Sequence, residues 1–193
     1  NMQFEQKVPW IQVGGKVLPD GSHQGGFNIN WHVGLDGISF PLIILTTLVT
    51  WLGAWASWNF DLWKVNRGPK GYFALFLLLE TGVLGTFAAL DFFLFYVFWE
   101  VMLLPMYFLI GVWGGKGRLY ASIKFFIYTM LGSLLMLVAI LVLYYSAGRA
   151  TGNFSFQYEH ILRYATVPGS AGFWLFGAFF LAFAIKVPLF PLH

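Results

Sequence analysis

Residues 92–113 have the sequence FFLFYVFWEVMLLPMYFLIGVW, in which a single acid, Glu100, interrupts an otherwise apolar run. A helix needs about 20 apolar residues to cross a hydrocarbon core of about 30 Å, and this stretch is long enough. An ionised side chain near the bilayer centre costs at least ~2.5 to 3.5 kcal/mol on insertion scales. We therefore predict a transmembrane helix here, with Glu100 deep inside it as part of an ion or proton path.

The composition of the whole chain indicates a membrane protein. Of the 193 residues, 59% are hydrophobic, 21% are aromatic and 10% are charged, whereas a soluble domain carries roughly 25% charged residues. The net charge of +3 is small and is spread between apolar runs, which favours a role in membrane orientation over nucleic-acid binding. Because the chain has no cysteine, it offers no thiolate-bound iron–sulfur cluster and no cysteine zinc site. We expect no metal and no cofactor on this chain, and any redox chemistry on a partner.

The apolar runs predict an all-α, polytopic bundle of transmembrane helices. Residues 1–37 are polar and rich in glycine, and are predicted to form an extramembrane loop, whereas residues 38–193 form one membrane domain. The predicted spans, about five in number, are residues 38–58, 72–90, 92–113, 119–145 and 172–193. Each is continuously apolar and about twice as long as the ten-residue alternating strand of a membrane β-barrel. The chain stops at His193 within or directly after an apolar run, and we expect it to be a fragment of a longer protein.

The loops between the spans predict an orientation in the membrane. Two short loops, residues 59–71 and 114–118, contain the basic residues Lys64, Arg67, Lys70, Lys116 and Arg118. By the positive-inside rule these two loops are predicted to be cytoplasmic. The polar residues 146–171 are then predicted to lie on the opposite side of the membrane, together with residues 1–37.

A second charge inside an apolar run is Lys186, two residues before Pro188. Proline lacks a backbone donor and disrupts a helix, and a broken helix near the bilayer midplane exposes backbone groups that hold water or ions. A buried acid must be protonated or paired with a cation, so we predict that Lys186 is the partner of Glu100. Two alternatives stay open: Glu100 only hydrogen-bonds a neighbouring helix for packing, or Lys186 only snorkels to the interface from a helix end.

Three further titratable residues are candidates for the same path. Lys124 lies near the start of its span, where its side chain either reaches the cytoplasmic interface or points inward as a relay between Lys186 and a water-filled entrance. Glu80 is costly to bury in its span, but helix packing explains it equally well. His193 is a residue type that carries protons in the physiological pH range.

Four stretches of the chain resemble one known family. They are GLDGIS at residues 34–39, FWE at 98–100 with LPMYFLI at 104–110 and WGG at 113–115, KFFIYT at 124–129, and KVPLFPLH at 186–193. Together they resemble the chain M family of antiporter-like membrane subunits of bacterial respiratory complex I, the NADH–quinone oxidoreductase. The glutamate and lysine motifs also occur in subunits of multisubunit cation/proton antiporters, and the Gly-Leu-Asp-Gly segment favours chain M.

The resemblance implies both a fold and a function. It implies a fourteen-helix subunit with two inverted five-helix repeats, of which this chain would hold the third to seventh helices, the last broken at Pro188. It further implies that Glu100 and Lys186 form the coupled pair of a proton channel, that Lys124 connects this pair laterally, and that His193 follows the broken helix. Glu80 matches no site of the family.

The activity that the resemblance implies is proton translocation in the membrane arm of complex I, driven by redox chemistry on partner subunits. The implied partners are other membrane-arm subunits, including further antiporter-like subunits, and the lipid bilayer of the bacterial inner membrane. Two alternatives stay open. A subunit of a multisubunit sodium/proton antiporter would use the same residues without NADH or quinone, and a structural membrane scaffold would use the charges only to fix helix packing.

Overall fold

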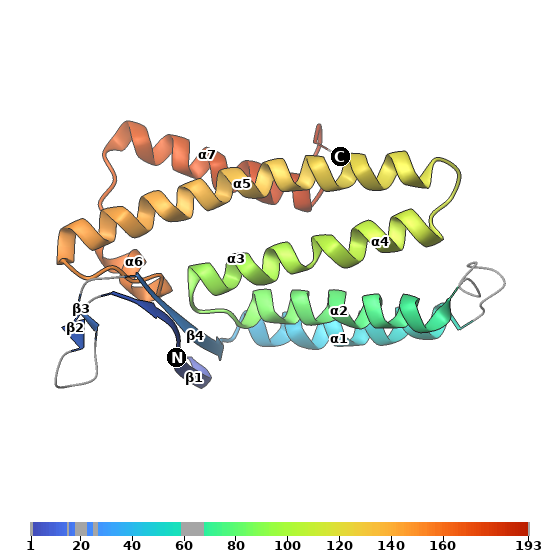
Figure 1. Cartoon of the computed structure of the whole chain (residues 1–193), viewed down its shortest axis with the longest axis horizontal. Helices are drawn as coiled ribbons and strands as arrows, with labels where there is room; N and C mark the ends of the chain where they lie inside the picture. The colour runs from blue at the N-terminus through green and yellow to red at the C-terminus, as the bar shows by residue number, and fades with distance from the viewer. Residues whose placement is uncertain (1, 15, 18–22, 25–26, 59–67, 193) are drawn as a thin grey trace.

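The computed structural model of the protein describes residues 2–14, 16–17, 23–24, 27–58 and 68–192. Its helices are α1 (Ser39–Ala56), α2 (Pro69–Ala88), α3 (Phe92–Val101), α4 (Leu103–Trp113), α5 (Arg118–Thr151), α6 (Tyr158–Tyr164) and α7 (Gly169–Lys186). Its strands are β1 (Gln3–Val13), β2 (Lys16–Val17), β3 (His23–Gln24) and β4 (Phe27–Leu35). The long helices lie roughly along one axis, and the strands and α6 gather at one end of them (Figure 1).

The prediction of a helical membrane bundle is confirmed. Within the described ranges, five helical segments are long and apolar enough to cross a membrane. They are Ser39–Ala56, Pro69–Ala88, Phe92–Trp113, Arg118–Thr151 and Gly169–Lys186. The third of these is interrupted at Met102, which separates α3 from α4.

Some helix boundaries differ from the predicted ones. α2 begins at Pro69, within the predicted loop 59–71, and the larger differences lie toward the C-terminus. The predicted span 119–145 continues as α5 to Thr151, so its last residues enter the polar segment 146–171, and that segment also contains α6. The predicted span 172–193 is helical only up to Lys186, where α7 ends before Pro188. Figure 1 shows that this end of α7 lies part of the way along α5 rather than at the end of the bundle.

Residues 1–37 contain a β-hairpin, which the prediction of a loop missed. β1 pairs antiparallel with β4, with Lys7 opposite His32 and Gln12 opposite Asn28. Nε2 of His32 lies 2.7 Å from Oε1 of Glu5, which joins the two strands by their side chains as well. The length of an apolar run does not reveal such a hairpin, because backbone hydrogen bonds between separate segments hold it together.

The hairpin is joined by backbone hydrogen bonds to the ends of the long helices. The amide of Leu90 donates to the carbonyl oxygen of His32 at 2.9 Å, and the amide of Tyr158 donates to that of Leu90 at 3.0 Å. The amide of Phe92 donates to the carbonyl oxygen of Phe156 at 2.9 Å. β4, the α2–α3 turn and the segment before α6 therefore form one connected layer, which fixes the start of α3.

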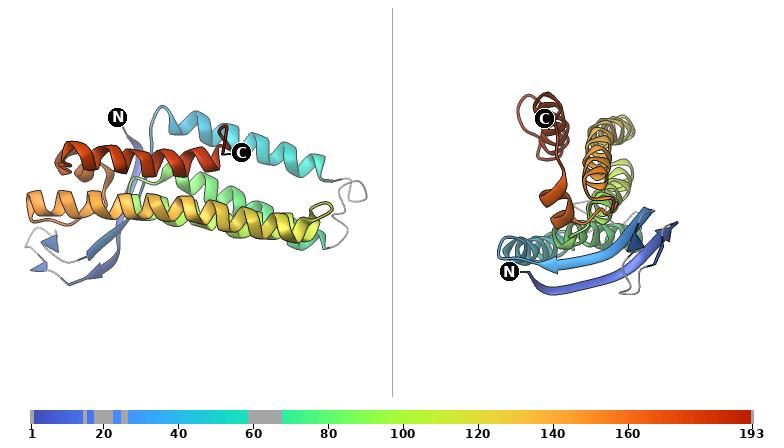
Figure 2. Two further views of the ribbon diagram at one scale, coloured as in Figure 1. Left: turned by 90° about the horizontal axis from the view of Figure 1, so that it is seen from above. Right: turned by 90° about the vertical axis from the view of Figure 1, so that its left-hand side faces the viewer.

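The buried core lies where α3, α5 and α7 pack with β4 and the segment before α6. Its buried residues are Ile29, Trp99, Met102, Met136, Ile140, Phe156 and Ala182. Both views in Figure 2 show α7 running alongside α5, and the two helices are in contact. A Cβ atom at Gly132 of α5 would lie 2.8 Å from Cδ1 of Ile185 and 3.6 Å from Cα of Ala182. A residue without a side chain at this position therefore lets α7 approach α5 closely.

Candidate functional site

Glu100 lies in the last turn of α3, beside the interruption of the third span. α3 ends at Val101, and α4 begins at Leu103. The last carbonyl groups of a helix lack donors from their own helix, and Pro105 in the first turn of α4 has no N–H group to offer. The interruption therefore leaves carbonyl oxygens near Glu100 available to other donors.

The amine of Lys186, the last residue of α7, reaches this interruption. Its Nζ donates a hydrogen bond to the backbone carbonyl oxygen of Trp99 at 3.4 Å. The same atom lies 4.8 Å from the centroid of the Trp99 ring, within the range of about 6 Å for a cation–π interaction. Trp99 is only 8% exposed, and its ring is stacked on Phe95 at 5.6 Å and meets Phe183 edge-on at 5.3 Å. Lys186 is therefore held by a backbone oxygen and by an aromatic ring of fixed orientation.

Glu100 and Lys186 lie near each other without forming an ion pair. The ion pairs in the part of the chain that the structure describes do not include these two residues. The charge of Glu100 nevertheless acts on Lys186 through space. Oε1 of Glu100 is buried and has no hydrogen-bond partner among the described residues. The structure thus brings the two predicted residues to one site, where the amine binds the residue next to the acid.

Tyr96 links Glu100 to Ser133 of α5. The hydroxyl of Tyr96 interacts with the side chains of both Glu100 and Ser133. Ser133, on α5, is 1% exposed, and its hydroxyl also donates to the carbonyl oxygen of Met130 at 3.0 Å. Sequence reasoning missed both residues. Tyr96 could have been found in the sequence, because it lies four residues before Glu100 and residues four apart on a helix share a face. Ser133 could not, because only the packing of α5 on α3 brings it to the site.

The other predicted residues do not join this site. Lys124 is exposed on α5 and Glu80 is half-buried on α2. Neither has a hydrogen-bond or ion-pair partner among the described residues. His193 lies outside the described residues. Within those same ranges, no three side chains of His, Cys, Asp or Glu gather to hold a metal ion.

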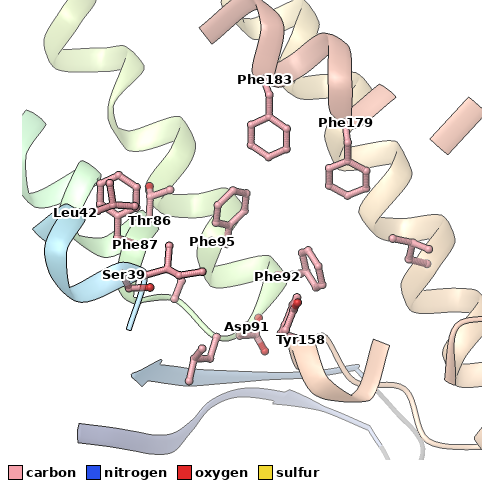
Figure 3. A pocket seen from close by; sticks show the side chains of 14 residues that line it. Ser39, Leu42, Thr86, Phe87, Asp91, Phe92, Phe95, Tyr158, Phe179 and Phe183 are labelled. Atoms are coloured by element: carbon pink, nitrogen blue, oxygen red, sulfur yellow. The ribbon is translucent and has the colours of Figure 1, made fainter. Parts of the chain in front are cut away.

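A cavity of about 550 Å³ lies beside the aromatic residues that hold Trp99 (Figure 3). Its lining includes Phe95 of α3 and Phe183 of α7, whose rings contact the Trp99 ring. Its lining residues with polar side-chain atoms are Ser39, Thr86, Asp91 and Tyr158. Figure 3 shows Asp91 and Tyr158 near the layer of strands and Phe183 on the far side. The cavity therefore extends from the N-terminal end of α3 toward the site at Trp99.

Asp91 is a buried acid at the N-terminal end of α3. Its Oδ1 accepts hydrogen bonds from the amides of Phe93 at 2.9 Å and Leu94 at 3.2 Å, which caps the N-terminus of α3. Asp91 is 1% exposed. Burial raises the pKa of Asp91 to about 6, and the bonds from the Leu94 and Phe93 amides oppose this rise. Asp91 therefore changes its protonation state close to neutral pH.

Comparison with known proteins places the chain in a family. The model of the family "NADH:quinone oxidoreductase/Mrp antiporter, TM" matches residues 89–193, which contain Glu100 and Lys186. The NADH-quinone oxidoreductase subunit M of Rhodobacter capsulatus is 42% identical over 198 residues, with 100% of this chain and 35% of that protein covered. Subunit M from Escherichia coli (strain K12) is 44% identical over 199 residues, with 99% of this chain and 35% of that protein covered. F(420)H(2) dehydrogenase subunit M of Methanosarcina mazei is 37% identical over 194 residues, with 100% of this chain and 36% of that protein covered.

A solved structure shares the fold. A chain of respiratory complex I from Thermus thermophilus with bound NADH matches with a TM-score of 0.68 and 40% identity, covering 85% of this chain and 32% of that one. The chain described here thus spans about a third of the length of these relatives. The resemblance to chain M subunits is confirmed by these matches. The protein is an integral membrane protein, and the chain belongs to the NADH:quinone oxidoreductase/Mrp antiporter transmembrane family.

Proposed function

We propose that this chain is part of a membrane-arm subunit of an NADH–quinone oxidoreductase and translocates protons through Glu100 and Lys186. The observation that carries the proposal is the position of the Lys186 amine, 3.4 Å from the carbonyl oxygen of the residue before Glu100. Two intramembrane charges, each costly to bury, meet where one helix ends and another is interrupted. The relatives are named as subunit M of NADH-quinone oxidoreductases, and the family model includes antiporters, which supports the same function.

The proton carriers in this proposal are the Glu100 carboxyl group and the Lys186 amine. While Glu100 is ionised, its charge stabilises the ammonium form of Lys186. When Glu100 takes up a proton or its carboxylate moves away, this stabilisation is lost and Lys186 passes its proton onward. In this proposal the Tyr96 hydroxyl, which interacts with both Ser133 and Glu100, orients the carboxyl group. This chain performs no redox step in the proposal, and the energy comes from redox chemistry on partner subunits.

The proposal also includes a location and partners. The chain would lie in a bacterial inner membrane, against lipid and other membrane-arm subunits, with residues 59–71 and 114–118 on the cytoplasmic side. The basic residues of these loops support this orientation. The ends of α1 and α2 that flank the first loop lie at the same end of the bundle as the α4–α5 turn (Figure 1). Lys124, exposed near that end, is proposed as the lateral connection, and His193 as a later carrier.

Proton pumping per NADH oxidised tests the proposal. The full complex carrying Glu100→Gln or Lys186→Ala would be reconstituted in proteoliposomes, with assembly checked on the same preparations. Both variants are expected to assemble and to lose most pumping. Matched controls are Glu159→Gln and Lys116→Ala, which remove the same charges from exposed positions outside the spans. Full pumping per NADH in either site variant would refute the proton-carrier role.

A second candidate function follows from the breadth of the family, whose model includes Mrp antiporters. A sodium/proton antiporter subunit would show sodium-dependent proton flux without NADH. The oxidoreductase subunits named above match 99% or more of the chain, which favours the first function. A purely structural role would appear as poor assembly of the two site variants with unchanged pumping per assembled complex.

A further inference from the structure

The Trp99 residue offers the Lys186 amine a binding position separate from Glu100. The amine donates to the Trp99 carbonyl oxygen at 3.4 Å and lies 4.8 Å from the ring centroid. The carbonyl oxygen is available because α3 ends two residues later, at Val101, and the last carbonyl groups of a helix lack helical donors. The interruption at Met102 therefore provides the acceptor.

The Trp99 ring provides the second half of this position. Tryptophan is the aromatic residue whose face attracts a cation most strongly. The ring cannot easily turn away, because Phe95 stacks on it at 5.6 Å and Phe183 packs nearly perpendicular to it at 5.3 Å. Trp99 is also 8% exposed, so little water competes for the cation.

The position is distinct from an ion pair with Glu100. Successive residues of an α-helix point about 100° apart around its axis. The Trp99 ring and the Glu100 carboxyl group therefore project from α3 in different directions. Among the described residues, Glu100 is the charged group whose field acts on Lys186, yet the two side chains are not paired. The lysine side chain is long and flexible and is anchored at the end of α7.

We propose that Trp99 is a positioning residue, whose ring and carbonyl oxygen hold the Lys186 ammonium apart from Glu100 between proton transfers. The inference rests on the proposed function. The amine alternates between the Glu100 carboxylate, which stabilises the ammonium form, and Trp99, from which the proton passes onward. Without the ring, the amine remains paired with Glu100 and releases its proton less readily.

The test compares Trp99→Leu and Trp99→Phe in the full complex in proteoliposomes. Pumping per NADH would be measured as a function of pH, together with the amount of assembled complex. We expect Trp99→Leu to reduce pumping at neutral pH by about 2- to 30-fold, the range of a cation–π interaction. Its pH profile should shift toward higher pH, because a more tightly held proton needs a lower proton concentration to leave. Trp99→Phe, which keeps an aromatic face, should fall between Trp99→Leu and the parent.

The matched control is Trp113→Leu, which removes an indole from the other end of the same span, where it packs edge-on against Tyr72 at 5.4 Å. A Trp99→Leu complex with the parent's pH profile and pumping per assembled complex would overturn the inference. If Trp99→Leu does not assemble, Trp99→Phe decides: a shifted profile supports the inference and an unchanged one overturns it. Lys186→Ala separates the two proposals, because retained pumping in that variant refutes the proposed function itself, whatever Trp99 does.

Discussion

The amine of Lys186 binds the backbone carbonyl oxygen of Trp99, a residue 87 positions earlier in the chain. This hydrogen bond joins the end of α7 to the last turn of α3. Its geometry depends on α5, because α7 lies close against that helix at Gly132. A change that shifts α7 along α5 would therefore also change the distance from the Lys186 amine to Glu100.

Replacement of Tyr96 by phenylalanine removes the hydroxyl that faces the Glu100 carboxyl group. A hydrogen bond to a charged group contributes roughly 1.5 to 3 kcal/mol, so we expect proton pumping by the full complex to fall about tenfold or more. The measurement is the initial pumping rate per assembled complex in proteoliposomes. Tyr120→Phe is the control, since Tyr120 is 73% exposed on α5. Equal pumping by the two variants would show that the Tyr96 hydroxyl does not serve the site.

Replacement of Gly85 by alanine is expected to destabilise the contact between α2 and α3. The added Cβ atom would overlap the ring of Phe98, two residues before Glu100. Overpacking of this kind costs typically about 1 to 3 kcal/mol. The midpoint of thermal inactivation of the purified complex should therefore fall. Gly177→Ala on α7, where no atom lies within 4 Å of the added Cβ, should leave the midpoint unchanged, and an equal midpoint for both variants would contradict the prediction.

Asp91 is expected to make the start of α3 less stable as pH rises. Its pKa is about 6 in the folded chain and 3.8 as a free group, so the unfolded state releases the proton first. The free energy of local unfolding is therefore largest below about pH 4, falls as pH rises to about 6, and is constant above that. The total change is about 3 kcal/mol, at ~1.4 kcal/mol per pKa unit.

Amide hydrogen exchange of residues 92–95 in the full complex measures this change, after correction for the intrinsic exchange rate. Asp91→Asn keeps an oxygen that accepts from the Phe93 and Leu94 amides but has no proton to titrate, so protection should be the same at about pH 4.5 and about pH 7. Asp36→Asn is the control. The pKa of Asp36 is lowered by hydrogen bonds from Ser39 and Ile38 at the start of α1. In this variant the protection of residues 92–95 should therefore still change with pH as in the parent. If the protection of residues 92–95 in Asp91→Asn still changed with pH as in the parent, a group other than Asp91 would be responsible.

Single cysteines test the proposed orientation, because the chain itself contains none. Lys116→Cys and Glu159→Cys place thiols at exposed positions near the two ends of the bundle. A membrane-impermeant maleimide should label Lys116→Cys in inverted membrane vesicles and Glu159→Cys in intact spheroplasts, with the parent protein as background. The reverse pattern of labelling would show that the chain has the opposite orientation in the membrane.

Several features of the fold and site could be predicted from the sequence because they depend on local composition. A run of about 20 apolar residues suffices to place a membrane span, and the runs around residues 38–58, 72–90 and 92–113 all correspond to helical segments. Glu100 and Lys186 stand out in such runs because an isolated charge there is costly. The roles of Lys124 and His193 stay predictions.

Other features depended on contacts between distant segments. The hairpin of β1 and β4 is built from residues 3–13 and 27–35 and is bound to the α2–α3 turn, so no single apolar run predicts it. Pro105 was a visible signal for the interruption at Met102, yet the surrounding residues are apolar enough to continue a span.

The sequence by itself determined which segments are apolar enough to enter the membrane and that Glu100 and Lys186 are charges inside them, because hydrophobic length and the cost of burying a charge are properties of each segment alone. Only the tertiary structure decided that the Lys186 amine binds Trp99 and that Tyr96 interacts with both Glu100 and Ser133. These contacts require α3, α5 and α7 to pack at one depth, and that depth is set by side-chain volumes meeting across helices, such as Gly132 against Ile185.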